Sequence, residues 1–434
     1  MARNRCQNFC GSPEHAVSRR SFLGATAALA GGMTGITALS EPAVCEQLKR
    51  KDKRVILLWL AGGPSQLETW DPKPGRPTGG PFLDIETSVP GVRVSEMLPE
   101  MAKRLARNTA IIRSLNTRDN NHGTASVMMM RGRKNEPNLQ YPDLGAMLAH
   151  ELGQADSQVP DYVSVFSQTE GRNFAKLGPG FLGARYAPIR LTEEMKLPHN
   201  QRLDSISDLD HRERADLRDL WSKRFVRGRQ SNTVNSHSTA YERVRGLMAS
   251  DKLFDISQEP QKVRDRYGPT LFGQHALIAR RLVESGVPFV RIARAWWDSH
   301  GQNFETHHEL VPELDHVMST LLDDLEERGL LDHTLVLTTA EFGRTPKING
   351  SLGRDHFSAA WSSTLSGCGV LPGAVYGKTD KDGQAVADGE IGAGEYYATI
   401  FRALGINHEH EFFVGSRPIP LVNPGIHPIQ QVLA

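Results

Sequence analysis

The strongest constraint on the fold is a unit that recurs along the chain, in which a short apolar run leads into a polar loop rich in Gly, His, Asp or Glu. The runs are Arg54–Leu60, Thr109–Leu115, Val287–Ala293 and Thr334–Thr339. Continuous apolar runs of this length are typical of parallel strands that are buried on both faces. The pattern therefore predicts strands of a mostly parallel sheet.

Helical periodicity alternates with these runs. Apolar residues recur at helical spacing in Pro99–Ala106, Leu271–Ser285, His308–Gly329 and Tyr396–Leu404. Glycines at or just beyond the ends of the last three segments are typical helix stops. Strand–helix alternation favours a doubly wound α/β fold, in which ligands bind beyond the carboxyl ends of the strands. The polar loops lie at those ends, so we expect them to form one composite site.

The first forty residues have the design of an export signal. Ser18–Leu23 resembles the twin-arginine motif, and the Gly/Ala-rich run that follows is less apolar than a membrane span. We expect residues 1–40 to be a signal peptide, 41–52 a linker and 53–430 a single α/β domain. This predicts export to the periplasm or beyond, with no stable membrane span after cleavage; an uncut N-terminal anchor is the alternative.

Composition limits the partners. The 51 Lys and Arg residues nearly balance 50 Asp and Glu residues, which gives no electrostatic reason to expect nucleic acid. Residues 191–253 are polar, with Leu at helical intervals from Asp208 to Arg227, which predicts a helical excursion on the core. Whether Cys45 and Cys368 pair stays open.

Two loops contain the clearest metal-ligand pattern. Asp298 and His300 lie two residues apart after a predicted strand, so both side chains can point to one side and bind a divalent cation. Glu341 directly follows the next strand and can be a metal ligand or a general base. An ion pair with Arg344 is the alternative for Glu341.

Two further loops add imidazoles, hydroxyls and positive charge. The segment Gly353–His356 offers Arg354 beside two potential ligands, Asp355 and His356, although it also fits an ordinary surface turn. His122, Thr124 and Ser126 open the apolar run Val127–Met130; if that run is helical, its free N–H groups can bind an oxyanion, and plain helix capping is the alternative. Taken together, the four loops suit a divalent metal that binds an anionic ester, with Arg344 or Arg354 neutralising charge.

The motifs occur together in a known family. The chain resembles domain-of-unknown-function family 1501 in the segments Gly62–Pro74, Gly178–Pro188, Trp297–Asn303, Glu341–Pro346 and Gly353–His356. That family is similar to the alkaline phosphatase and sulfatase superfamily. The resemblance implies a three-layer, doubly wound, mostly parallel, alkaline phosphatase-like sheet and metal-assisted ester hydrolysis.

The resemblance also implies a ligand set. In the superfamily an Asp/His pair, a carboxylate after a later strand and a further His bind metal, and this order matches Asp298, His300, Glu341 and His356. Glu341 stands where Asp is usual. The first loop lacks the paired aspartates of sulfatases, and we take Asp71 as its metal ligand.

The nucleophile departs from the superfamily pattern. The superfamily nucleophile opens a helix that runs into a Thr-Gly-Arg turn, and here Arg131–Arg133 resembles that turn. Counting back the same distance reaches His122 instead of Cys, Ser or Thr. Three alternatives follow: Thr124 or Ser126 replaces the nucleophile, His122 is a ligand, or no covalent step occurs.

The leading hypothesis is therefore an exported, metal-dependent hydrolase that acts on phosphate or sulfate esters, with one or two divalent ions, which can be Zn, Ca, Mg or Mn. The alternative is a non-catalytic protein of the cell envelope that binds anionic polysaccharide on a degenerate scaffold.

Overall fold

The computed structural model describes residues 52–134, 136–154, 157, 159–165, 178–192, 194–195, 205–226 and 253–434. The expected signal peptide, Cys45 and all but the last residue of the expected linker lie outside these ranges. Among the described residues, every helix is too short or too polar to span a bilayer.

A central sheet of eight strands organises the domain, in the order β12-β4-β11-β8-β1-β7-β5-β6. Its strands are β1 Arg54–Leu60, β4 Thr109–Leu115, β5 Tyr162–Val165, β6 Ile189–Leu191, β7 Phe289–Arg294, β8 Thr334–Thr339, β11 Trp361–Gly367 and β12 Val375–Tyr376. Only β11 runs antiparallel to its neighbours, β4 and β8. The expected strands and the mostly parallel sheet are confirmed.

Small two-stranded sheets form within the loops outside the central sheet. They are β2 Asp84–Glu86 with β3 Arg93–Ser95, β9 Gly343–Arg344 with β10 His356–Phe357, β13 Lys378–Thr379 with β14 Val386–Asp388, and β15 Glu411–Val414 with β16 Arg417–Pro420. The pairing of β9 with β10 places His356 opposite Arg344. This pairing joins two of the polar loops.

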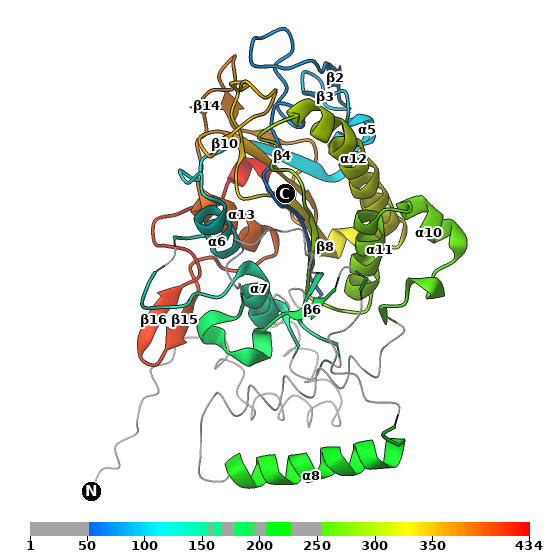
Figure 1. Ribbon diagram of the computed structural model, residues 1–434. Coiled ribbons are helices and arrows are strands. Elements are labelled where there is room, and N and C mark those ends of the chain that lie inside the picture. The colour runs from blue at the N-terminus through cyan, green and yellow to red at the C-terminus, as the bar shows by residue number, and fades with distance from the viewer. Residues whose placement is uncertain are drawn as a thin grey trace, which may run out of the picture. The chain divides into compact units, whose positions relative to one another are not determined.

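Helices cover both faces of the central sheet, which confirms the three-layer α/β class. The helices among the described residues are α5 Pro99–Asn108, α6 His122–Arg131, α7 Leu144–Leu152, α8 Asp208–Val226, α10 Gln261–Tyr267, α11 Leu271–Glu284, α12 Asn303–Glu327 and α13 Ala393–Ala403; of these, α10 packs on α11 and α12. Figure 1 shows α5, α11 and α12 on one side of the sheet and α6, α7 and α13 on the other. Within the polar segment expected to be helical, the structure describes the helix α8.

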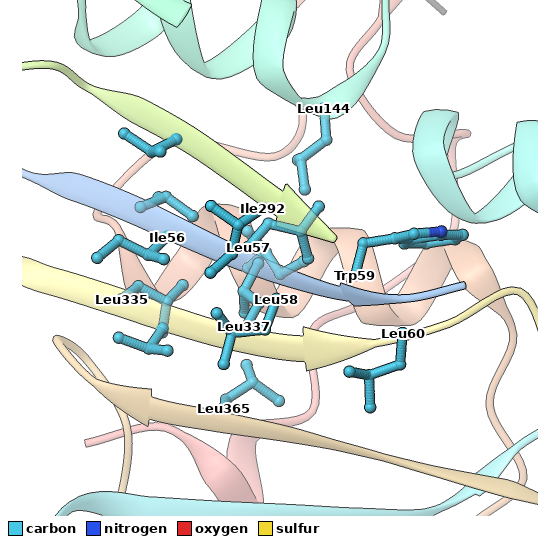
Figure 2. Close-up of a cluster of buried hydrophobic side chains, with 14 of the residues drawn as sticks. Ile56, Leu57, Leu58, Trp59, Leu60, Leu144, Ile292, Leu335, Leu337 and Leu365 are labelled. Atoms are coloured by element: carbon cyan, nitrogen blue, oxygen red, sulfur yellow. The ribbon is translucent and has the colours of Figure 1, made fainter. Parts of the chain in front are cut away.

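The core lies between these layers. Every residue from Val55 to Leu60 in β1 is at most 1% exposed. Figure 2 shows side chains of β1 beside Ile292 of β7, Leu335 of β8 and Leu365 of β11. Because β1 has hydrogen-bonded neighbours on both sides and helices on both faces, its continuous apolar run is what the environment requires.

Candidate metal centre

Strand order positions the site. β1 pairs in parallel with both β7 and β8, so the loops that follow these three strands leave the same edge of the sheet. These loops carry Gly62, Asp298 and Glu341 respectively. Gly62 has φ +112°, and a Cβ there would lie 2.5 Å from the backbone nitrogen of Asp298. A glycine is therefore required for the first loop to pack directly on the Asp298 loop.

Three histidines and one aspartate meet at this edge. Ligand atoms of His122, Asp298 and His356 all lie within 4.8 Å of one another. His300 joins them, because its Nε2 is 2.9 Å from Nε2 of His356 and 3.1 Å from Oδ1 of Asp298. Nε2 of His356 is 3.2 Å from the same Asp298 oxygen. The structure thus brings together His122 and three of the five residues expected to bind metal.

Hydrogen bonds on the opposite ring nitrogens fix how these imidazoles face the centre. Nδ1 of His356 lies 2.7 Å from the backbone carbonyl of Asn120, and Nδ1 of His300 lies 2.8 Å from Oδ1 of Asp355. Both partners can only accept, so both Nδ1 atoms donate. In the neutral rings the two Nε2 lone pairs then face each other and the Asp298 carboxylate. A shared cation at this point removes the repulsion, and this orientation is typical of metal-bound histidine.

His122 has the same arrangement. Its Nδ1 donates to Oε1 of Glu341 at 2.7 Å, while its Nε2 lies 3.2 Å from Oδ2 of Asp298. Glu341 is fully buried, and the same Oε1 accepts from the backbone N–H of Gly62 at 2.9 Å. The structure therefore places Glu341 behind His122, where it orients the ring.

The charges at the centre favour a cation. Burial lowers the pKa of His122, but hydrogen bonds with Asp298 and Glu341 outweigh that effect and raise the pKa to about 9. Burial raises the pKa of Asp298, yet contacts with His122, His356 and Arg344 hold it far below its usual range. Without a metal, a proton occupies His122, so we expect proton and metal to compete for Nε2.

Glu341→Gln tests the orienting role. The amide keeps the shape of the side chain and removes the negative charge behind His122, so we expect metal affinity to fall by about 10–100-fold. Isothermal titration of the metal-free protein with Zn²⁺ measures the change. Glu309→Gln, on the exposed face of α12, is the matched control and should leave the affinity unchanged. Equal affinities in the two variants would contradict the role given to Glu341.

Arg344 is a scaffold residue at the edge of the centre. It is fully buried, its Nε donates to the backbone carbonyl of Gly63 at 2.9 Å, and its Nη2 contacts the carbonyl of Gly62 and donates to Oδ1 of Asp298 at 2.6 Å. These contacts hold the first loop and Asp298 together. Because Arg344 binds protein groups, we do not expect it to bind the substrate directly. Its positive charge acts on the site only from its position beside Asp298.

Arg354 and Asp71 lie apart from the histidines. Arg354 is fully buried and donates to Oε1 of Glu68 at 2.7 Å and to the carbonyls of Thr78, Thr345 and Pro346. Asp71 forms an ion pair with Lys73 at 2.9 Å and accepts a hydrogen bond from Thr379. Neither side chain contacts the centre. Each instead forms hydrogen bonds and ion pairs with other loop residues.

At the beginning of α6, a polar side chain caps the helix, as the alternative to oxyanion binding predicted. Oδ1 of Asn121 accepts from the backbone N–H groups of Gly123 and Thr124, at 2.9 and 3.3 Å. These donors are therefore not free for an oxyanion. Ser126 is 1% exposed and its hydroxyl is buried, whereas Thr124 is exposed. Of the two candidate hydroxyls, only Thr124 is accessible.

Backbone strain concentrates around the centre. Among the described residues, five that are not glycine have positive φ: Arg118, Met195, Trp296, Gln302 and Leu352. All but Met195 lie within four residues of His122, Asp298, His300 or His356. Such conformations persist where the surrounding structure enforces them, and they cluster at functional sites.

Sequence reasoning missed the orienting roles of Asp355 and Asn120, which hold His300 and His356. Asp355 directly precedes His356, and its position beside a candidate ligand is the one signal that could have found it. The role of Asn120 uses its backbone carbonyl, which no side-chain pattern reveals.

Comparison with known proteins identifies one sequence family. The profile of the family described as "Protein of unknown function (DUF1501)" matches residues 52–433. The sequence matches none of the curated proteins with which it was compared.

Several solved structures are similar at low scores. The lipoteichoic acid synthase LtaP from Listeria monocytogenes has 10% identity and a TM-score of 0.36, over 86% of this chain and 75% of that one. A sulfatase from Pseudoalteromonas sp. has 12% identity and a TM-score of 0.37, over 83% and 71%. A magnesium-bound mutant of TAB5 alkaline phosphatase has 12% identity and a TM-score of 0.33, over 82% and 98%. Similarity at this level assigns no activity.

Proposed function

Because this chain belongs to the DUF1501 family, which itself has no described activity, we propose its function from the site alone: a metal-dependent hydrolase of phosphate or sulfate esters. The observation that carries the proposal is the convergence of His122, His300 and His356 on Asp298, with each Nδ1 held by an acceptor. Three imidazoles whose Nδ1 atoms are held by acceptors and whose Nε2 atoms face one carboxylate have the orientation typical of metal-bound histidine.

The donor set favours a particular class of metal. Imidazole nitrogen suits Zn²⁺ and neighbouring transition metals, whereas Ca²⁺ and Mg²⁺ prefer oxygen ligands. We therefore favour Zn²⁺ among the divalent ions that the sequence left open. Three imidazoles and a carboxylate would hold it, and catalysis would require that water binds as a further ligand.

The accessible position of the centre suits catalysis. The side chains of Asp298 and His300 are 43% and 48% exposed, so a substrate can approach from solvent. A bound metal supplies a water of lowered pKa and polarises the ester oxygen. Asp298 and the histidines would hold the metal, while Glu341 and Asp355 accept from Nδ1 of His122 and His300 and so turn Nε2 of each ring toward it. His122 then acts as a ligand, and no covalent intermediate with the chain is needed.

Thr124→Ala separates metal-activated water from covalent catalysis. If water attacks the ester, removing the Thr124 hydroxyl should change turnover by less than about threefold, because the hydroxyl takes no part in the reaction. Steady-state hydrolysis of aryl phosphate and aryl sulfate esters by the zinc-loaded protein measures this. A loss of about 100-fold or more would assign Thr124 as the nucleophile and overturn the water mechanism.

The same panel decides whether the protein is an enzyme. Turnover that requires added Zn²⁺ and falls in His356→Ala supports the hydrolase. Metal-loaded protein that hydrolyses no ester yet binds anionic polysaccharide would instead support the alternative of a non-catalytic envelope protein.

The proposal includes export by the twin-arginine route, supported by the segment Ser18–Leu23 and the Gly/Ala-rich run that follows it. Folding before export would allow the metal to be loaded in the cytoplasm, and the substrate would then be an anionic ester or polysaccharide of the periplasm or the medium. Replacing Arg19 and Arg20 together by Lys should retain the protein in the cytoplasmic fraction.

A further inference from the structure

A second polar cavity lies away from the histidines, on the loop that carries Asp71. Its volume is about 420 Å³, which falls in the range typical of small-molecule sites. It is lined by Asp71, Lys73, Arg113, Gly377, Lys378, Thr379, Asp380, Lys381 and Ala387. None of the four residues that converge at the candidate metal centre lines this cavity.

The lining is positively charged. Lys73, Arg113, Lys378 and Lys381 outnumber the two carboxylates, Asp71 and Asp380, by two. Lys378 and Lys381 are exposed, and neither has an ion pair with another described residue. Oδ1 of Asp380 accepts hydrogen bonds from the backbone N–H groups of Asp382 and Gln384, both at 2.9 Å. The carboxylate therefore stabilises the turn that it belongs to.

Asp71 organises the inner wall. One of its carboxylate oxygens lies 2.9 Å from Nζ of Lys73 and 3.7 Å from Nη1 of Arg113, and the other accepts from the Thr379 hydroxyl. Arg113 is anchored by a bond from Nη2 to the carbonyl of Arg93 at 2.6 Å. Its Nε is buried and has no hydrogen-bond partner. A single carboxylate thus holds two cations and a hydroxyl at one wall without neutralising both cations.

We propose that this cavity binds a phosphate- or sulfate-bearing sugar unit, as a second anion site independent of the metal centre. The excess of two cations over carboxylates in the lining matches a negatively charged phosphate or sulfate ester, and charge-assisted bonds from lysine and arginine to such oxygens are among the strong ones. The cavity is larger than an inorganic oxyanion requires, so the remaining space accommodates the sugar. Such a site would hold one unit of an anionic glycan.

Calorimetric titration of the full chain tests the inference. The probes are glucose 6-phosphate, glucose 6-sulfate, inorganic phosphate and glucose, at one ionic strength. The two sugar esters should bind, with inorganic phosphate weaker and glucose undetectable. The double variant Lys378→Gln/Lys381→Gln should weaken binding of glucose 6-phosphate by at least about tenfold, since two charge-assisted contacts are lost.

Two controls separate this site from other sources of binding. Lys262→Gln removes an exposed lysine on α10 and should leave affinity unchanged. With metal-free protein, in which no metal can bind the ester at the histidines, His300→Ala should also leave the affinity unchanged. Equal affinity in the double variant and the parent, binding of glucose as tight as its esters, or loss of binding in His300→Ala would each overturn the inference. Because both lysines are exposed, thermal unfolding should confirm that the double variant is folded.

Discussion

Replacing His300 by alanine is expected to remove the metal from the purified protein and to abolish ester hydrolysis. Nε2 of His300 faces both His356 and Asp298, so its loss leaves the centre without one of four converging ligands. Changes to groups behind a ligand typically cost about 10–100-fold in metal affinity, and we expect loss of the ligand itself to exceed that range. Metal content by mass spectrometry and turnover with Zn²⁺ measure the two effects.

Because His300 is exposed, its replacement should affect metal binding without destabilising the fold. Its side chain is 48% exposed, so the variant should unfold at nearly the parent temperature. His427→Ala, which removes another exposed histidine, is the matched control and should retain metal and activity. Unchanged zinc content in His300→Ala would contradict the ligand assignment, whatever the effect on turnover.

Arg354→Ala should instead destabilise the fold, by about 3–5 kcal/mol in the free energy of unfolding. Arg354 and Glu68 are both fully buried and lie 2.7 Å apart. Removing the guanidinium leaves the Glu68 carboxylate buried and unpaired, and it also frees the carbonyls of Thr78 and Thr345. Urea denaturation followed by circular dichroism measures the loss.

Arg118→Ala provides the comparison. Arg118 also forms an ion pair, with Glu390 at 2.7 Å, but the two side chains are 75% and 43% exposed. Exposed pairs contribute at most about 1 kcal/mol, so this variant should be nearly as stable as the parent. If Arg354→Ala kept full stability and lost turnover, Arg354 would belong to the catalytic machinery and not to the scaffold.

Strands β1, β4, β7 and β8 could be predicted because they are largely apolar, as β1 shows. β11 could not be predicted in this way, since Trp361–Gly367 is rich in Ser and Thr. Two of its buried hydroxyls have partners: Ser363 donates to the carbonyl of Thr338 at 2.8 Å, and Ser366 lies 2.9 Å from the hydroxyl of Thr109. Hydrogen bonds between buried hydroxyls cannot be predicted from the spacing of apolar residues.

The position of the centre could be predicted in part, because the strands that lead into it are apolar. Asp298 and Glu341 follow apolar strands that are neighbours of β1, so strand order alone brings them to one edge. The direction of each side chain within a loop could not be predicted. In Gly353–His356, Arg354 turns into the protein while Asp355 and His356 turn to the centre, and only the β9–β10 pairing fixes this.

Diffraction from zinc-supplied crystals at energies on both sides of the zinc absorption edge tests the central claim most directly. The account predicts an anomalous peak bonded to Nε2 of His122, His300 and His356 at about 2.0–2.1 Å and to a carboxylate oxygen of Asp298 at about 2.0–2.2 Å. A zinc-loaded protein whose anomalous peaks all lie elsewhere, with these four side chains bridged only by water, would contradict it.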